Sequence, residues 1–146
     1  MNGRLLAIAR KAKSHAPMEE IPTADISIEF GIAGDFRGSS KRRQITVLAI
    51  EDWRAAVESI GCSGLPWTTR RANLLVENMA LPRRIGARFS IGDVVLEVTE
   101  ETEPCARMEK ARAGLRAALT PEWRGGVCCR VITGGQIAPG AEIKSA

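Results

Sequence analysis

The stretch "DVVLEVTEET", residues 93–102, alternates apolar and other side chains, and this alternation decides the fold class. Val94, Leu96 and Val98 fall on one face of an extended strand, and the residues between them fall on the other. A period of two over several residues is typical of a strand with one face in a core. The stretch therefore predicts a sheet that covers an apolar interior.

Similar strands are predicted along most of the chain. Residues 44–50, "QITVLAI", are almost all apolar, which is typical of a central strand, and residues 26–30, "ISIEF", again alternate. Shorter candidates cover residues 4–9, 73–76, 88–91, 126–133 and 141–145. So many short strands in 146 residues predict one mostly-β domain over residues 1–146, a twisted closed β-barrel rather than a sandwich.

Two or three short helices are expected to interrupt the strands. Apolar residues recur at helical spacing in residues 51–61, "EDWRAAVESIG", and in residues 106–119, "ARMEKARAGLRAAL". Gly114 lies inside the second pattern and costs about 1 kcal/mol relative to alanine, so this helix depends on packing. Pro121 is expected to end it.

Composition excludes several classes of protein. No apolar run approaches the roughly 20 residues that cross a bilayer, so no membrane association is expected. Aromatic residues make up only 4% of the chain and are not interleaved with basic ones, which argues against nucleic-acid binding. The start of the chain lacks a signal-peptide pattern; its basic residues would suit a transit peptide, but a first strand over residues 4–9 is preferred.

The cysteines also indicate the compartment. The chain has four of them, Cys62, Cys105, Cys128 and Cys129, with no CxxC pair and a single histidine far away in sequence. A zinc site is therefore not expected. We expect reduced thiols in a cytoplasmic protein. Cys128 and Cys129 lie inside a predicted strand, where small apolar fillers are the favoured interpretation.

Basic residues gather at two places. Residues 36–44, "FRGSSKRRQ", contain a first cluster, and residues 67–76, "WTTRRANLLV", add Arg70, Arg71 and Asn73 just before a predicted strand. The first cluster consists of Arg37, Lys41, Arg42 and Arg43. Such groups suit a ligand that bears phosphate, although a solvated surface is the more frequent explanation of such clusters.

Cys105 is the residue that most suggests chemistry. It follows Pro104 at the junction between a predicted strand and a predicted helix. At a helix start, free backbone N–H groups favour a thiolate, and the nearby Arg107 and Lys110 act in the same direction. Several carboxylates oppose this: Glu100, Glu101, Glu103 and Glu109. The local sequence leaves a functional and an inert cysteine equally open.

Taken together, these segments resemble the MOSC domain, the C-terminal domain of molybdenum cofactor sulfurases and its small stand-alone bacterial relatives. The resemblance covers roughly residues 20–146 and rests on "GIAGDFRG", the "RRANLL" strand entry, the "IGD" turn and above all "PCARME". It implies a twisted β-barrel with the matching cysteine, Cys105, at a cleft. In the family, that cysteine is thought to carry sulfur as a persulfide or to contact molybdenum.

The resemblance also implies an anion and pterin-phosphate site. Its groups would be matched here by Arg71 and Asn73, and by Arg37, Arg42 and Arg43 of the basic stretch. Asp35 matches the Gly-Asp of the family, where a structural role in the loop and contact with a ligand are both open.

Departures from the family pattern bear on partners. The pyridoxal-phosphate domain of the full-length sulfurases is absent from this sequence, so pyridoxal phosphate binding is a family-level property only, and a cysteine desulfurase would have to donate sulfur. A molybdoenzyme or a cofactor-maturation protein would accept it. The β-barrel extension of the larger amidoxime-reducing relatives is also missing, so a bound molybdopterin cofactor would be less enclosed.

Three functions remain as hypotheses. The first is a sulfur transferase, a carrier that uses a Cys105 persulfide to deliver sulfur to a metal–sulfur centre. The second is a molybdenum–pterin oxidoreductase that reduces N-hydroxylated compounds with an external reductase, with Cys105 as the molybdenum ligand. The third is an anion-binding module without turnover, in which Cys105 has no chemical role.

Overall fold

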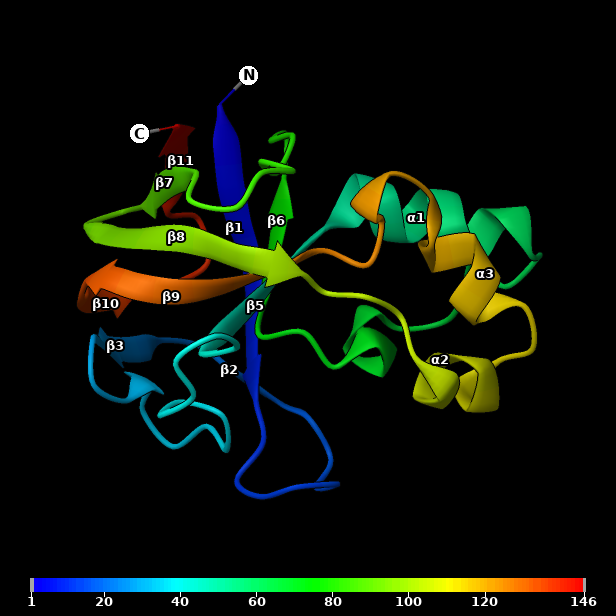
Figure 1. Cartoon of the computed structure of the whole chain (residues 1–146), viewed down its shortest axis with the longest axis horizontal. Helices are drawn as coiled ribbons and strands as arrows, with labels where there is room; N and C mark the ends of the chain where they lie inside the picture. Colours follow the sequence, from blue (N-terminus) through cyan, green and yellow to red (C-terminus); the bar gives the residue numbers. More distant parts are fainter. Residues whose placement is uncertain (1, 146) are drawn as a thin grey trace.

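The computed structural model describes residues 2–145, and within this range seven strands close into a barrel (Figure 1). Around the ring, the strands follow the order β1 (Gly3–Arg10), β11 (Glu142–Ser145), β7 (Arg88–Ile91), β8 (Val94–Glu101), β9 (Val127–Thr133), β5 (Ile45–Ala49) and β6 (Leu74–Glu77). The ring closes because β11 pairs with both β7 and β1. The closed barrel predicted from the alternating segments is thus confirmed.

The strand pairings explain why the predicted alternation holds. Pairing is antiparallel around the ring except between β5 and β6, which run parallel with Leu48 opposite Leu75. In β8, Val94, Leu96 and Val98 are buried and the residues between them are half-buried, as the sequence predicted. A β-bulge between Val98 and Glu100 then bends β8 as it leaves the barrel.

A smaller sheet lies beside the barrel, and here one prediction is wrong. β2 (Glu19–Ile21) extends the large sheet next to β1, and β10 (Gly135–Ile137), β3 (Ala24–Ser27) and β4 (Gly31–Ile32) form a separate three-stranded sheet. The predicted strand over residues 26–30 ends at Ser27, because the chain turns at residues 28–30 to enter β4. Ile28 and Phe30 consequently face solvent instead of the core.

The helices gather on one side of the barrel, on the right in Figure 1. They are α1 (Ile50–Ser59), α2 (Ala106–Ala111) and α3 (Leu115–Leu119), with two 3₁₀ turns, η1 (Trp67–Arg70) and η2 (Pro121–Trp123). The single helix predicted over residues 106–119 is therefore wrong. Gly114 has φ of 88°, a left-handed conformation that breaks the helical ladder between α2 and α3.

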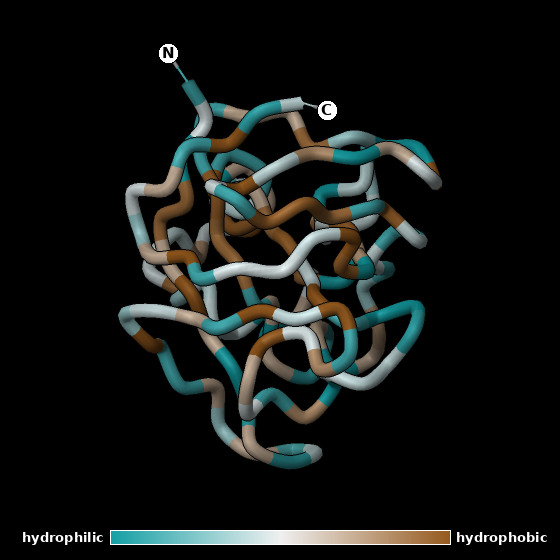
Figure 2. Tube along the Cα trace, turned by 90° about the vertical axis from the view of Figure 1, so that its left-hand side faces the viewer, coloured by the Kyte–Doolittle hydropathy of each residue, from teal (hydrophilic) through white to brown (hydrophobic). Residues whose placement is uncertain are grey.

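Two apolar clusters hold these parts together. The larger fills the barrel and includes Phe89, Leu96 and Cys129, all fully buried. The smaller lies between the barrel wall and the helices and includes Trp53 and Met108. Figure 2 shows hydrophobic segments along the inner strands and hydrophilic ones in the outer loops. Among residues 2–145, no helix is both long and apolar enough to cross a membrane.

Candidate functional site

Cys105 lies where the chain leaves the barrel and starts a helix. It is the N-cap residue of α2, with extended backbone angles, and its side chain makes no capping hydrogen bond. Its carbonyl oxygen accepts from the Met108 N–H at 2.9 Å, and the buried Met108 side chain anchors this short helix in the apolar cluster beneath. The Cys105 side chain is exposed, so its thiol is accessible to a reaction partner.

The thiol borders a cleft of about 130 Å³, which we call the Cys105 cleft. Its lining is strongly basic, and among the lining residues only Asp35 is acidic. The basic lining residues are Lys11, Arg37, Arg43, Arg70, Arg71 and Arg107. They come from the residue after β1, from the basic stretch, from the last residue of η1 and the one after it, and from α2, so segments far apart in sequence converge on one cleft.

Arg70 is the buried cation of this cleft. Only 6% of the residue is exposed, and its guanidinium donates from Nε to the Gly125 carbonyl at 3.1 Å and from Nη2 to the Thr102 carbonyl at 2.6 Å. Within residues 2–145, no carboxylate forms a salt bridge with it. Burial lowers the pKa of the Arg70 guanidinium, and the neighbouring Cys105 thiol acts in the opposite direction. A buried positive charge without a carboxylate partner favours an anion in the cleft.

Arg71 and Asn73 reach the cleft by different means. Arg71 has φ of 64° at the end of η1, and its Nη2 donates to the Ala16 carbonyl at 2.5 Å. The buried Asn73 donates from Nδ2 to the Ala9 carbonyl at 3.1 Å and accepts on Oδ1 from the Thr46 N–H at 3.0 Å. Asn73 thus joins β1, β5 and β6, and both atoms of its amide have protein partners.

Asp35 organises the loop that carries Arg37. Its Oδ1 accepts from the Lys11 N–H at 3.1 Å, and its Oδ2 accepts from the Arg37 N–H at 3.2 Å. These bonds give Asp35 a structural role in the loop, and its carboxylate also lines the cleft. Lys11 also lines the cleft. Burial, followed by the charges of Arg71 and Arg37, lowers the pKa of its ammonium group.

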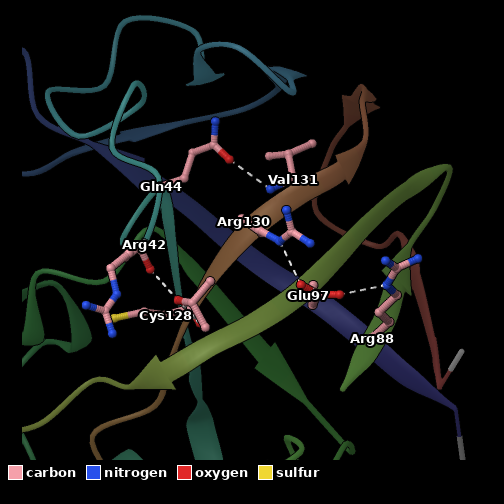
Figure 3. Close-up of polar contacts among 8 residues, drawn as sticks. Arg42, Gln44, Arg88, Glu97, Cys128, Arg130 and Val131 are labelled. Atoms are coloured by element: carbon pink, nitrogen blue, oxygen red, sulfur yellow. Dashed lines mark hydrogen bonds and ion pairs between the residues drawn. The ribbon is translucent and has the colours of Figure 1, made fainter. Parts of the chain in front are cut away.

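The basic stretch divides between the cleft and the surface. Arg43 lines the cleft, and the neighbouring Cys128 is the first cause that raises the pKa of its guanidinium. Its Nε lies 3.8 Å from Glu100 Oε1. Arg42 is exposed and does not line the cleft. Its backbone carbonyl accepts a hydrogen bond from the Thr99 hydroxyl (Figure 3). Of the three predicted arginines, the structure thus brings Arg37 and Arg43 to the cleft.

Of the two cysteines predicted as apolar fillers, Cys129 belongs to the core of the barrel, whereas Cys128 is buried beside polar groups. Cys128 and Cys129 are fully buried in β9, and burial raises the pKa of the Cys129 thiol well above its usual range. The Cys128 sulfur lies 3.2 Å from the Thr102 hydroxyl oxygen. The carboxylates near Cys105 are half-buried or exposed, and burial followed by the charge of Glu103 raises the pKa of Glu101.

Part of the cleft could not be predicted from the sequence. Lys11 follows the first strand, and only barrel closure brings it next to residues 35–37. Arg70 was recognised as a cation before a strand, but its burial follows from its contacts with Thr102 and Gly125, more than 30 positions away. Arg107 lies two residues after Cys105 and was recognised only for its charge.

A second cavity, of about 340 Å³, lies near the other ends of β5 and β6. It is lined in part by Asp52, Arg83 and Trp123 and has no cysteine in its lining. Burial raises the pKa of the Asp52 carboxyl. The lining of this second cavity shares no residue with that of the Cys105 cleft.

Solved structures show the same fold. The YuaD protein of Bacillus subtilis superposes with a TM-score of 0.80 at 20% identity over 98% of this chain and 94% of that one. YiiM of Escherichia coli gives a TM-score of 0.74 at 14% identity, covering 98% of this chain and 69% of that one. YiiM of Geobacillus stearothermophilus gives a TM-score of 0.77 at 15% identity, covering 99% of this chain and 75% of that one. At these identities, the likeness is one of fold alone.

Sequence comparison defines the family more directly. No curated protein matches this chain significantly. The MOSC domain, however, matches residues 33–144, which include the basic stretch, the strand entry at Asn73 and the Pro104–Cys105 pair. The match covers most of the chain. The chain therefore belongs to the MOSC domain family.

Proposed function

We propose that this chain is a sulfur carrier of the molybdenum-cofactor type, with Cys105 as the residue that holds sulfur as a persulfide. The observation that carries the proposal is the pairing of an exposed thiol with a buried arginine, since Cys105 and Arg70 line the same cleft. A thiolate and a persulfide are both anions, and a buried guanidinium without a carboxylate partner stabilises either one.

The transfer step is a thiol exchange. The Cys105 thiolate attacks the outer sulfur of a donor persulfide, a new S–S bond forms at Cys105, and the donor S–S bond breaks. The donor leaves as a thiolate, so Cys105 sulfur is oxidised and donor sulfur is reduced without an external oxidant. Passing the sulfur to an acceptor thiol repeats the exchange. Release of the outer sulfur as sulfide to a metal centre requires two electrons. A second thiol supplies them when it attacks the Cys105 sulfur, because a disulfide with Cys105 forms as the persulfide S–S bond breaks.

The arrangement of charge supports this chemistry over an inert cysteine. Lys11, Arg37 and Arg107 line the cleft together with the buried Arg70, and the Asp35 carboxylate accepts from two backbone N–H groups. Anionic leaving groups and incoming persulfides are both stabilised in such a site. An unused core cysteine would instead resemble Cys129, which is fully buried among apolar side chains.

The residues of the cleft also fit a molybdenum cofactor. A soft thiolate suits molybdenum, and the guanidinium groups of Arg37, Arg70 and Arg71 suit the pterin phosphate. When bound, the cofactor would supply two-electron redox chemistry; Cys105 would hold its metal and the arginines its phosphate. The cleft of about 130 Å³ is smaller than the roughly 300–1,000 Å³ of sites that enclose a comparable ligand. This size favours the carrier over the oxidoreductase.

The proposal implies two partners. A cysteine desulfurase would load Cys105, and a molybdoenzyme or a cofactor-maturation protein would unload it. Both would have to bring their reacting atoms to the N-terminal end of α2, because Cys105 is exposed there.

The experiment that tests the proposal is persulfide loading followed by intact-mass and peptide mass spectrometry. The folded protein is incubated with a cysteine desulfurase and L-cysteine, or with glutathione persulfide alone. We expect the mass of one or more sulfur atoms on the peptide that contains Cys105. Cys105→Ser should abolish it, and the matched variant Cys62→Ser should keep it. No added sulfur on Cys105 with either donor, or equal loading of wild type and Cys105→Ser, would refute the carrier function of Cys105.

A further inference from the structure

Exposed apolar side chains lie on the segment that contributes Asp35, Arg37 and Arg43 to the Cys105 cleft, and they have no role in the chemistry described above. The segment comprises residues 28–43, and we call it the 28–43 segment. Ile28 is 63% exposed, Phe30 is 59% exposed and Phe36 is 45% exposed. The chain has only three phenylalanines, and the third, Phe89, is fully buried in the barrel. Two of three phenylalanines on one surface segment is unusual for a chain with so few aromatic residues.

The segment is fixed in shape rather than loose. Gln44, which is 4% exposed, donates from Nε2 to the carbonyls of Ile28 at 2.7 Å and Gly38 at 3.0 Å. Its Oε1 accepts from the Val131 N–H of β9 at 2.8 Å, a contact drawn in Figure 3. One buried amide therefore ties both ends of the apolar surface to the barrel.

Close backbone contacts bring the apolar residues together. A Cβ atom on Gly38 would lie 1.9 Å from the Phe30 carbonyl oxygen and 3.3 Å from that of Asp35, so the two halves of the segment touch at this glycine. The Phe36 N–H donates to the Lys11 carbonyl at 2.7 Å, which joins the segment to the wall of the cleft. Such a preformed surface loses little conformational entropy when it binds a partner.

The charge around this surface is positive. Arg37, Lys41 and Arg42 are exposed on the same segment, and Arg37 also lines the Cys105 cleft. Exposed aromatic residues next to arginines are the composition that protein interfaces favour, with the aromatics as anchors and the charges as a rim. The rim selects a partner with an acidic surface.

From these observations, we infer that the 28–43 segment is the docking surface for an acidic protein that carries the sulfur donor. The inference rests on the proposed function and names the partner of the same site. Phe30 and Phe36 would enter an apolar depression on the donor, and Arg37, Lys41 and Arg42 would face its carboxylates. Docking there would bring the donor persulfide towards Cys105, because Arg37 and Arg43 of the same segment line the Cys105 cleft.

A lipid surface fits these residues less well. Glu29 lies between Ile28 and Phe30 and is exposed, so insertion of the apolar residues would take a carboxylate out of water. At a protein interface, a partner lysine or arginine can meet the same carboxylate. We therefore commit to a protein partner.

The test compares a protein donor with a small one. The rate of persulfide formation at Cys105 is measured with persulfide-loaded cysteine desulfurase and, separately, with glutathione persulfide, which needs no docking surface. Variants are Phe30→Ala, Phe30→Ala with Phe36→Ala, and Lys41→Glu. The matched controls are Ile85→Ala, which removes another exposed apolar side chain, and Arg84→Glu, which reverses another exposed charge.

We expect the double variant and Lys41→Glu to lower kcat/KM for the protein donor about tenfold, with the rate from glutathione persulfide unchanged. The controls should behave like the wild type. An equal loss with both donors, or no loss with the protein donor, would overturn the inference.

A binding measurement separates this inference from the proposed function. The affinity of the desulfurase for wild type and variants is measured by biolayer interferometry at low and high salt, with Cys105→Ser as the background so that no transfer occurs. Weaker, less salt-dependent binding of Lys41→Glu would support the surface even if Cys105 carried no sulfur. The binding of the same variants to vesicles of phosphatidylcholine and phosphatidylglycerol is measured alongside. Unchanged affinity for the desulfurase, or weaker binding to the vesicles alone, would refute the inference.

Discussion

Arg70 Nη2 lies 2.6 Å from the carbonyl oxygen of Thr102, three residues before Cys105. This contact joins the turn that enters β6 to the segment that leaves β8, and it holds a buried positive charge next to the thiol. The same guanidinium bonds to Gly125, where a Cβ atom would lie 2.9 Å from Arg70 Nη2 and 2.4 Å from the Thr102 carbonyl oxygen. The glycine is therefore required for Arg70 to occupy this position.

Arg70→Lys should destabilise the protein, although it keeps the charge. A lysine ammonium cannot bond to both the Thr102 and Gly125 carbonyls in the forked geometry of a guanidinium, so a buried carbonyl loses its partner. We expect a loss of about 1–3 kcal/mol in the free energy of unfolding, measured by urea denaturation. Arg116→Lys on the exposed face of α3 is the control. Equal midpoints for both variants would show that the fork contributes nothing.

Alkylation should rank the four thiols by exposure. Cys105 is exposed, Cys62 is half-buried, and Cys128 and Cys129 are buried. With iodoacetamide and peptide mass spectrometry at a series of pH values, we expect Cys105 to react first and the two β9 cysteines only after unfolding in urea. Burial, which raises the pKa of the Cys129 thiol, also disfavours its reactive thiolate. Protection of Cys105 in the folded protein would contradict the site described here.

Gly114→Ala discriminates between one helix and two. If residues 106–119 formed a single helix, alanine would stabilise it by about 1 kcal/mol. With φ of 88° and a Cβ position 3.3 Å from Ile60 Cγ2, we expect instead a loss of about 1–2 kcal/mol. Thermal or urea unfolding measures the sign. Gly64→Ala is the control, since no atom lies within 4 Å of its Cβ position.

Glu97 should make stability depend on pH. Hydrogen bonds first from Arg130 at 2.7 Å and then from Arg88 at 3.0 Å lower the pKa of its carboxyl (Figure 3). The folded state thus holds the ionised form, and this stability is present above the unfolded pKa of about 4.3 and is lost as the pH falls through the folded pKa.

Substitution isolates this effect. Glu97→Gln should reduce the free energy of unfolding at pH 7 by about 1 kcal/mol or less, because both arginines are half exposed and water screens the pairs. The difference from wild type should disappear at pH values below the folded pKa. Glu58→Gln on the exposed side of α1 provides the comparison. A difference between Glu97→Gln and wild type that is the same at every pH would exclude an electrostatic origin.

Local sequence patterns predicted most of the strands because their side chains meet a fixed environment. The alternation of Val94, Leu96 and Val98 is buried as expected, since a strand of the barrel has one face inside and one outside. The same pattern misled at residues 28–30. Gln44 draws the Ile28 carbonyl into a turn, and this contact comes from a residue 16 positions away. Residues 28–30 therefore still alternate in the sequence, although the strand has ended at Ser27.

The sequence by itself determined which segments become strands with one buried face and that Cys105 starts a helix, because both depend on neighbours a few positions apart. Only the tertiary structure decided what surrounds the thiol. Lys11, Arg37 and Arg70 meet at Cys105 because the barrel closes and brings their strands and turns to one place. The burial of Arg70, and with it the positive charge at the thiol, follows from carbonyls 32 and 55 positions away. No local pattern encodes contacts of that range, since they arise only when the whole core has formed.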